Sequence, residues 1–273
     1  MPGPIRTLLP KPSRIRRVRL GKPATWWPPV AVRQEHAYRN IWQGLRQHGE
    51  VEPPSESRRA WAERAEFYAV CAIRVPSSPE FRDAVAPIRE ALGQFPFVAL
   101  FPPGSLYITI QELGLLVDSP AKSWESSTAR IEEFREQAGL PISDFPAFEI
   151  ELGGFNSFLD MPFLDVHDDG WCFRIHHRLR DFVAGTLNDS FAYLPYVPLG
   201  YYTHAAEMGP FPAKMAPWRD ARIGRFTATS VDILRVSTRD PLAMPEVMHQ
   251  FELGHHIGPT DSIREGTAPR EIW

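Results

Sequence analysis

The stretch Ser105–Gly114, SLYITIQELG, has a counterpart later in the chain, Leu194–Thr203, LPYVPLGYYT. Both are short runs of apolar and aromatic residues, and each meets a glycine after a Tyr-x-Thr or a Tyr-x-Pro triplet. Runs of this composition, bounded by glycine and proline, are typical of β-strands. We therefore predict two similar strands, one in each half of the chain, and a fold of two equivalent lobes around one cleft.

Each predicted strand presents two different faces, because side chains alternate along a strand. In the first stretch, Tyr107, Thr109 and Gln111 share one face, and leucine and isoleucine residues share the other. In the second stretch, Tyr196 and Pro198 share one face, and valine and leucine share the other. We expect the tyrosine face of each strand to line the cleft.

The composition is that of a globular protein with a sizeable core. The chain has 273 residues, of which 43% are hydrophobic and 12% aromatic, and its formal net charge is −3. Such a chain can bury a core and has no polyelectrolyte character. Its two cysteines, Cys71 and Cys172, lie in apolar surroundings, so we expect buried free thiols and not a disulfide framework.

No membrane or secretory segment is recognisable in the sequence. The longest apolar run, Phe67–Ile73, is too short to cross a bilayer, and the N-terminus lacks the apolar region of a signal peptide. We therefore expect a cytoplasmic protein without a membrane partner.

We expect the chain to divide into three parts: a basic and aromatic extension over residues 1–66, a bilobal domain over 67–254, and a loosely held tail over 255–273. Within the extension, Met1–Lys22 carries seven Lys and Arg residues and no Asp or Glu. Such an arm could dock on phosphates or on another partner, or it could be a solvated tail or pack on an acidic face of its own domain. The sequence leaves these alternatives open.

Periodic patterns place helices between the strands and predict an α+β fold. We expect two pseudo-symmetric antiparallel-sheet lobes with outer helices around a central cleft. The predicted helices are His36–His48, Ser57–Glu66, Glu80–Gln94, Ser126–Ala138 and Ile175–Leu187. Besides the two key stretches, the predicted strands are Phe67–Val75, Phe97–Leu100, Phe148–Phe155, Phe158–Val166, Trp171–Arg174 and Arg225–Val236, while Glu246–Leu253 could be a short helix or a strand.

The tetrapeptide His167–Gly170, HDDG, lies between two apolar runs. Asp-Gly in this setting is a strong signal for a β-hairpin. A metal site made by His167, Asp168 and Asp169 is the alternative, and we favour the hairpin. We expect no metal and no cofactor, since the sequence has no P-loop, GxGxxG or HExxH motif.

At its two key stretches the sequence resembles the 2H phosphoesterase superfamily, which contains the 2′-5′ RNA ligase-like (LigT-like) proteins and the cyclic phosphodiesterases. In that family each of two strands carries a His-x-Thr/Ser motif, followed by a hydrophobic pair and often by Leu-Gly. YITIQELG and YVPLGYYT stand where these motifs would stand, and the resemblance spans about Phe67 to Gly254. Tyr107 and Tyr196 take the histidine positions, Thr109 takes the first hydroxyl position, and Pro198 replaces the second.

The resemblance implies a cleft in which two histidines would act as base and acid on a cyclic or bridging phosphate. Imidazole suits this role because its reference pKa of about 6.5 lies near the working pH, whereas that of tyrosine is about 10. A tyrosine base at pH 7 would need about 4 kcal/mol of additional phenolate stabilisation. We therefore expect that the ordinary hydrolysis by a histidine pair does not occur in this protein.

The resemblance and the order of the sequence give the candidate site residues. The candidate catalytic residues are Tyr107, Tyr196 and His204, of which His204 directly follows the second strand. The candidate ligand-binding residues are Thr109, Gln111, Tyr202 and Arg174.

Three functions follow as hypotheses. The first is a degenerate member of the resembled family that binds a small nucleotide-like or RNA-end ligand in a tyrosine-lined cleft. The second is a repurposed enzyme in which Tyr107 or Tyr196 acts as acid or base in a different reaction. The third is a non-catalytic interaction protein whose cleft is filled and whose extension docks a partner.

Overall fold

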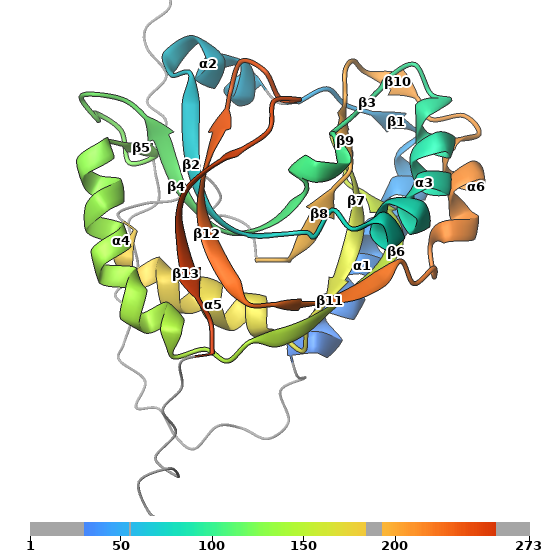
Figure 1. Ribbon diagram of the computed structural model, residues 1–273. Coiled ribbons are helices and arrows are strands. Elements are labelled where there is room, and N and C mark those ends of the chain that lie inside the picture. The colour runs from blue at the N-terminus through green and yellow to red at the C-terminus, as the bar shows by residue number, and fades with distance from the viewer. Residues whose placement is uncertain (1–29, 55, 184–192, 255–273) are drawn as a thin grey trace, which may run out of the picture.

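A computed structural model describes residues 30–54, 56–183 and 193–254 of the chain (Figure 1). Two curled sheets stand next to each other, with helices packed around them. The predicted α+β fold with two lobes is therefore confirmed. The expectations for Met1–Lys22 and for the tail over 255–273 lie outside the described residues.

The elements alternate between helices and strands along the chain. The helices are α1 (Val30–His48), α2 (Glu56–Arg64), α3 (Pro79–Gly93), α4 (Thr128–Ser143), α5 (Trp171–Leu179) and α6 (Phe211–Met215), with short 3₁₀ turns at Pro103–Ser105, Arg180–Phe182 and Ala216–Trp218. The strands are β1 (Glu50–Val51), β2 (Phe67–Arg74), β3 (Val98–Leu100), β4 (Tyr107–Leu116), β5 (Glu125–Ser126), β6 (Phe148–Ser157), β7 (Pro162–His167), β8 (Tyr196–Pro198), β9 (Gly200–Tyr202), β10 (Ala206–Glu207), β11 (Gly224–Ala228), β12 (Ser230–Ser237) and β13 (Glu246–Glu252).

The first lobe contains a five-stranded sheet in the order β13-β12-β2-β4-β5. Its pairs are antiparallel except for the short parallel contact between β4 and β5. Strand β2, FYAVCAIR, pairs with β4 so that Arg74 lies opposite Tyr107. Two register shifts interrupt this pairing, and the first, between Ala72 and Cys71, places Glu112, not Gln111, opposite Val70. The side-chain alternation of β4 therefore changes after Thr109, which a strictly regular strand would not do.

The second lobe contains a four-stranded antiparallel sheet in the order β11-β6-β7-β8. Strands β11 and β12 are separated only by Thr229, so one stretch of chain passes from the second sheet directly into the first (Figure 1). The two smaller pairs, β1 with β10 and β3 with β9, complete the described strands.

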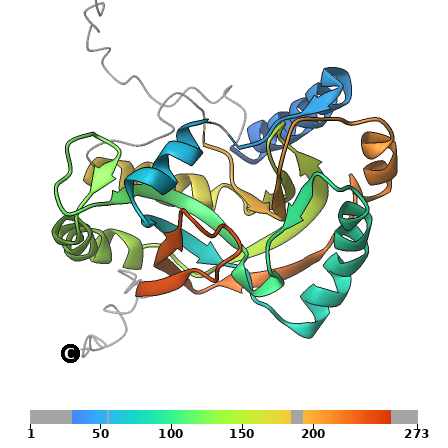
Figure 2. The same ribbon diagram turned by 90° about the horizontal axis from the view of Figure 1, so that it is seen from above.

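Helices cover the sheets because each presents one apolar stripe. Helix α3, predicted over Glu80–Gln94, begins with a Ser78 side chain that accepts from Phe81 N, and it buries Phe81, Val85, Ile88 and Leu92 on one stripe. Helix α5 packs on β4, and α4 packs on α5 and β13. Seen from above, α1 and α3 lie on opposite sides of the second sheet (Figure 2).

Helix α1 is fixed to β7 by one buried tyrosine. The Tyr38 hydroxyl donates to Pro195 O at 2.5 Å and accepts from Val166 N at 3.2 Å. Its ring lies 6.5 Å from the Phe163 ring, and Asn156 Nδ2 donates to its backbone oxygen. The predicted helix over His36–His48 thus exists but begins earlier, at Val30.

The predicted hairpin at His167–Gly170 is wrong. Strand β7 ends at His167 and helix α5 begins at Trp171, so no strand follows the Asp-Gly pair. The Asp168 carboxylate accepts from Gly170 N at 3.1 Å and from Cys172 N at 2.5 Å. It therefore satisfies amide groups at the start of the helix, which is the ordinary role of an aspartate before a first turn.

Within the described ranges, no helix combines the length and the apolar character that crossing a bilayer requires.

Candidate functional site

The strands β4 and β8 meet at a small cavity with aromatic walls. Its volume is about 130 Å³, and Tyr107 of β4 and Pro198 of β8 both line it. We call it the tyrosine cavity. The residues that line it are Trp61, Tyr68, Phe101, Ser105, Tyr107, Glu112, Pro198, Val236, Ser237, Thr238, Pro241, Ala243 and Pro245.

Tyr107 is held at this cavity by a neighbouring phenol. The hydroxyl groups of Tyr107 and Tyr68 lie 2.9 Å apart, and the Tyr68 ring lies 6.5 Å from the Trp61 ring at an angle of 52°. Both tyrosines pack on a small apolar cluster that is separate from the main core: Val70, Ala72, Leu234 and Val236. Of this cluster, Val236 lines the cavity together with the aromatic side chains.

Arg74 lies directly across the strand pair from Tyr107. Its side chain is 52% exposed, while its Nε contacts the carboxylate of Asp232, which is 1% exposed. Within the described part of the chain, the terminal nitrogens of Arg74 and the Oδ1 atom of Asp232 have no hydrogen-bond partner. A buried carboxylate thus orients a guanidinium whose outer donors remain available to an anion.

Tyr196 belongs to a different aromatic group. Its ring lies 5.1 Å from the Phe158 ring and 5.2 Å from the Phe163 ring, and its backbone pairs with Asp165 in β7. It shares a strand face with Pro198, two residues later, which does line the tyrosine cavity. Strands β4 and β8 therefore meet through Tyr107 and Pro198, while the rings of Tyr107 and Tyr196 pack against different neighbours.

Thr109 and Gln111 are placed by the backbone of β4. The Thr109 carbonyl accepts from the Tyr193 hydroxyl at 2.9 Å. Gln111 is 2% exposed and donates from Nε2 to the backbone oxygen of Glu112 at 3.0 Å. Because of the register shift, Glu112 and not Gln111 lines the tyrosine cavity together with Tyr107. The expected common face of Tyr107, Thr109 and Gln111 is thus broken at Gln111.

The remaining candidates do not line the tyrosine cavity. His204 is exposed, and its Nδ1 lies 2.9 Å from the Thr203 hydroxyl. Arg174 is exposed on α5, with its guanidinium 4.5 Å from the centre of the Trp171 ring. Tyr202 is fully buried, and this burial raises the pKa of its phenol.

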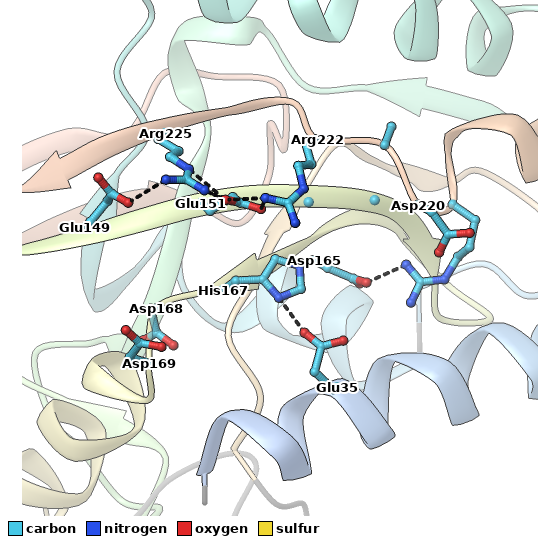
Figure 3. A pocket seen from close by; sticks show the side chains of 14 residues that line it. Glu35, Glu149, Glu151, Asp165, His167, Asp168, Asp169, Asp220, Arg222 and Arg225 are labelled. Atoms are coloured by element: carbon cyan, nitrogen blue, oxygen red, sulfur yellow. Dashed lines mark hydrogen bonds and ion pairs between the residues drawn. The ribbon is translucent and has the colours of Figure 1, made fainter.

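A second and larger cavity lies on the second sheet beside α1 (Figure 3). Its volume is about 510 Å³, which falls in the range of small-molecule sites. We call it the charged cavity. The residues that line it are Glu35, Glu149, Glu151, Gly153, Gly154, Asp165, His167, Asp168, Asp169, Arg219, Asp220, Ala221, Arg222 and Arg225.

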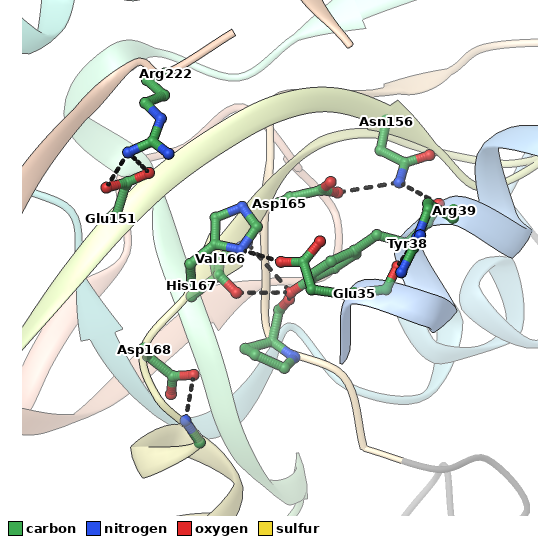
Figure 4. A network of polar contacts seen from close by, with 12 residues as sticks. Glu35, Tyr38, Arg39, Glu151, Asn156, Asp165, Val166, His167, Asp168 and Arg222 are labelled. Carbon is green, nitrogen blue, oxygen red and sulfur yellow. Dashed lines mark hydrogen bonds and ion pairs between the residues drawn. The ribbon is translucent and has the colours of Figure 1, made fainter. Parts of the chain in front are cut away.

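A histidine and two carboxylates of the charged cavity lie where α1 packs beside β7 (Figure 4). His167 Nδ1 lies 2.6 Å from Glu35 Oε1, which ties α1 to β7. Asp165, two residues before His167, is paired with Arg219 at 2.5 Å and accepts from Asn156 Nδ2 at 3.0 Å. Burial nevertheless raises the pKa of Asp165 to about 6, because desolvation of its carboxylate outweighs these contacts.

Two glycines allow the chain to approach closely at this cavity. A Cβ on Gly153 would lie 2.3 Å from His167 Nε2, and one on Gly154 would lie 1.5 Å from the backbone oxygen of Arg219. At the rim, Arg222 and Arg225 pair with Glu151 (Figure 3). The charged side chains at the rim therefore form ion pairs with one another.

The sequence did not point to Arg74, Trp61 or Glu112, and it pointed to His167, Asp168 and Asp169 of the charged cavity only as an alternative metal site. Strand alternation in FYAVCAIR could have placed Arg74 on a face with Tyr68, but its position opposite Tyr107 depends on the register of two strands. Trp61 comes from helix α2 in the extension, where no local pattern points to the cavity.

Comparisons with known proteins bear on the same strands. The family model of the 2′-5′ RNA ligase superfamily matches residues 70–240, which is more than half of the chain. No curated protein matched the chain.

Solved structures share the fold at low sequence identity. A protein of Thermus thermophilus is 16% identical, with a TM-score of 0.50 over 69% of this chain and 100% of its own. E. coli LigT, solved in complex with 3′-AMP, is 16% identical, with a TM-score of 0.51 over 69% of this chain and 98% of its own. A structure described as a phosphoesterase is 15% identical, with a TM-score of 0.51 and the same coverage as LigT. Identities this low support a shared fold and nothing more. The family model, by contrast, covers more than half of the chain, including β4 and β8. The chain therefore belongs to the 2′-5′ RNA ligase superfamily.

Proposed function

We propose that this protein binds a small nucleotide-like ligand at the tyrosine cavity and does not hydrolyse phosphodiesters through a pair of histidines. The observation that carries the proposal is the position of Tyr107, between an aromatic cavity on one side and Arg74 across the strand pair. Aromatic rings stack on bases, and a guanidinium binds phosphate oxygens. The aromatic cavity thus suits the base of a nucleotide, and Arg74 suits its phosphate. Both lie beside Tyr107.

The size of the cavity limits what it holds. Whole small-molecule ligands fill cavities of roughly 300 to 1,000 Å³, and the tyrosine cavity measures only about 130 Å³. The cavity therefore takes one part of the ligand, such as the base, and the phosphate remains outside at the half-exposed Arg74.

Loss of the family's hydrolysis follows from the residue types at the motif positions. By the resemblance of YITIQELG and YVPLGYYT to the family's two motifs, Tyr107 and Tyr196 take the positions of the imidazole base and acid. A phenol with its reference pKa of about 10 is almost fully protonated at neutral pH and cannot accept the proton that an imidazole would. Pro198 in addition has no hydroxyl to offer a phosphate oxygen.

The nucleotide in the LigT complex supplies the first probe. LigT was solved with 3′-AMP, a mononucleotide with a terminal phosphate. Binding of 3′-AMP and of adenosine to the purified full chain would be measured by isothermal titration calorimetry. We expect 3′-AMP to bind more tightly than adenosine, because only 3′-AMP offers a phosphate to Arg74.

Arg74→Ala tests the role of this side chain. We expect it to weaken 3′-AMP binding at least tenfold and leave adenosine binding nearly unchanged, since a charge-assisted contact contributes about 1.5–3 kcal/mol. Arg82→Ala, which removes an exposed arginine of α3 away from both cavities, serves as the matched control. Equal losses in the two variants, or no 3′-AMP binding by the unaltered protein, would count against the proposal.

Incubation with 2′,3′-cyclic AMP separates the binding protein from a repurposed enzyme. We expect the cyclic nucleotide to remain intact over hours. Turnover that is lost in Tyr107→Phe or Tyr196→Phe, with the melting temperature unchanged, would instead assign acid–base chemistry to that phenol.

A further inference from the structure

The tyrosine cavity has an unusual balance of charge for a site in a family that acts on phosphates. Four aromatic side chains line it: Trp61, Tyr68, Phe101 and Tyr107. Glu112 contributes the single charged side chain among its described lining residues, and neither Lys nor Arg is among them. Arg74 lies across the strand pair and does not line the cavity itself.

This lining is poorly suited to an anion. A buried negative charge needs donors or cations to replace its water shell, and a carboxylate beside it would repel it. The same walls suit a positive charge, because the face of an aromatic ring carries negative electrostatic potential. Alkylated cations fit best, since they are weakly hydrated and lose little on entering an apolar cavity.

The arrangement of the walls supports this reading. The Trp61 ring is tilted by 52° to the Tyr68 ring, at 6.5 Å, and Tyr68 joins Tyr107 through their hydroxyls at 2.9 Å. Trp61 comes from helix α2, Tyr68 from strand β2 and Tyr107 from strand β4. Tyr68 contacts both of the other side chains and so holds the three rings in place. A cavity of about 130 Å³ holds a head group or one heterocyclic base, and not an entire nucleotide.

We propose that the group bound in the tyrosine cavity is a weakly hydrated organic cation: an alkylated ammonium, or a base that carries a positive charge through N-alkylation. The proposal rests on the proposed function, because it names the part of the ligand that the same cavity holds. Arg74 would still contact a phosphate outside the cavity when the cation is part of a nucleotide.

Paired probes that differ only in charge test the proposal. N7-methylguanosine 5′-monophosphate carries a cationic base, and guanosine 5′-monophosphate is its neutral-base counterpart. Tetramethylammonium supplies the cation without a nucleotide. Binding of each to the full chain would be measured by calorimetry, together with the quenching of tryptophan fluorescence. We expect the methylated nucleotide to bind about tenfold more tightly than the unmethylated one, as cation–π contacts in desolvated sites allow.

Two variants connect this preference to the cavity. Glu112→Gln removes the carboxylate at nearly constant volume, and Trp61→Leu removes an aromatic wall; we expect either to reduce the preference to about twofold or less. Glu90→Gln, on the exposed side of α3, is the matched control and should retain it. If Glu112→Gln lowers the melting temperature, its loss of preference has a second explanation, and the result for Trp61→Leu then decides the test.

The outcomes separate the two proposals. Equal affinity for the two guanosine nucleotides, or a preference that survives in both variants, would overturn the cation proposal; with binding still dependent on Arg74, the proposed function would stand. Binding of tetramethylammonium without binding of any nucleotide would support the cation proposal and reject the proposed function. Binding of the methylated nucleotide but not of tetramethylammonium would assign the charged base, and not an ammonium, as the cation.

Discussion

Asp165 is a residue whose protonation depends on its position inside the second lobe. Its side chain is 3% exposed, and its carboxylate is paired with Arg219 at 2.5 Å. Burial raises the pKa from an ordinary value of 3.8 to about 6. The folded protein therefore binds this proton more tightly than the unfolded chain does.

The direction of the pH dependence follows from this difference. Folding favours the protonated carboxyl, so the contribution of Asp165 to stability is greatest below about pH 3.8 and is lost as the pH rises to about 6. Relative to Asp165→Asn, the unaltered protein should lose up to about 3 kcal/mol of unfolding free energy across this window. Urea unfolding of both proteins between pH 4 and pH 7 measures the change.

The difference in unfolding free energy between the two proteins should change over this range. A constant difference, or one that shifts in favour of the unaltered protein as the pH rises, would contradict the raised pKa of Asp165.

At the scale of elements, helix α2 matters because it carries Trp61 to the tyrosine cavity. Arg64, at the end of α2, donates from Nε to Glu125 at 2.7 Å. The Glu125 carboxylate also accepts from Ala121 N at 2.7 Å and from Lys122 N at 3.2 Å. The Arg64 guanidinium and these amides hold the pKa of Glu125 at about 2, well below its ordinary value of 4.5.

Glu125→Gln should therefore lower the melting temperature at pH 7 and weaken ligand binding at the cavity. The stability that Glu125 contributes is present above pH 4.5 and is lost as the pH falls toward 2, so the two proteins should converge on acidification. Glu132→Gln, which breaks an exposed i,i+3 pair with Arg135, is the control and should have little effect. If the difference in stability between the two proteins stays constant from pH 7 to pH 3, the ionised carboxylate of Glu125 is not what stabilises its contact with Arg64.

The elements that the sequence predicted well are those with strong local patterns. Strand β2 was found because it is a short, continuous apolar run, and helix α3 because its apolar residues repeat with the helical period. The turn at Asp168 was misread because Asp-Gly fits both a hairpin and the start of a helix, and only the hydrogen bond to Cys172 N decides between them. The site at Arg74 could not be read from local sequence, since it depends on the register between two strands.

At the scale of the whole molecule, the two lobes share one hydrophobic core. Strands β11 and β12 run from one sheet into the other, and Tyr107 and Pro198 meet at the tyrosine cavity. Helix α1, which precedes the region matched by the family model, packs on the second sheet through Tyr38 and contributes Glu35 to the charged cavity. Residues before the family region thus contribute to both cavities, through Trp61 in one and Glu35 in the other.

A crystal structure of the full chain with 3′-AMP tests the central claim most directly. The account predicts phosphate oxygens within hydrogen-bond distance of the Arg74 guanidinium, and the base or sugar in contact with Tyr107 at the tyrosine cavity. Density for the nucleotide only in the charged cavity, or only at a surface remote from Tyr107, would contradict it.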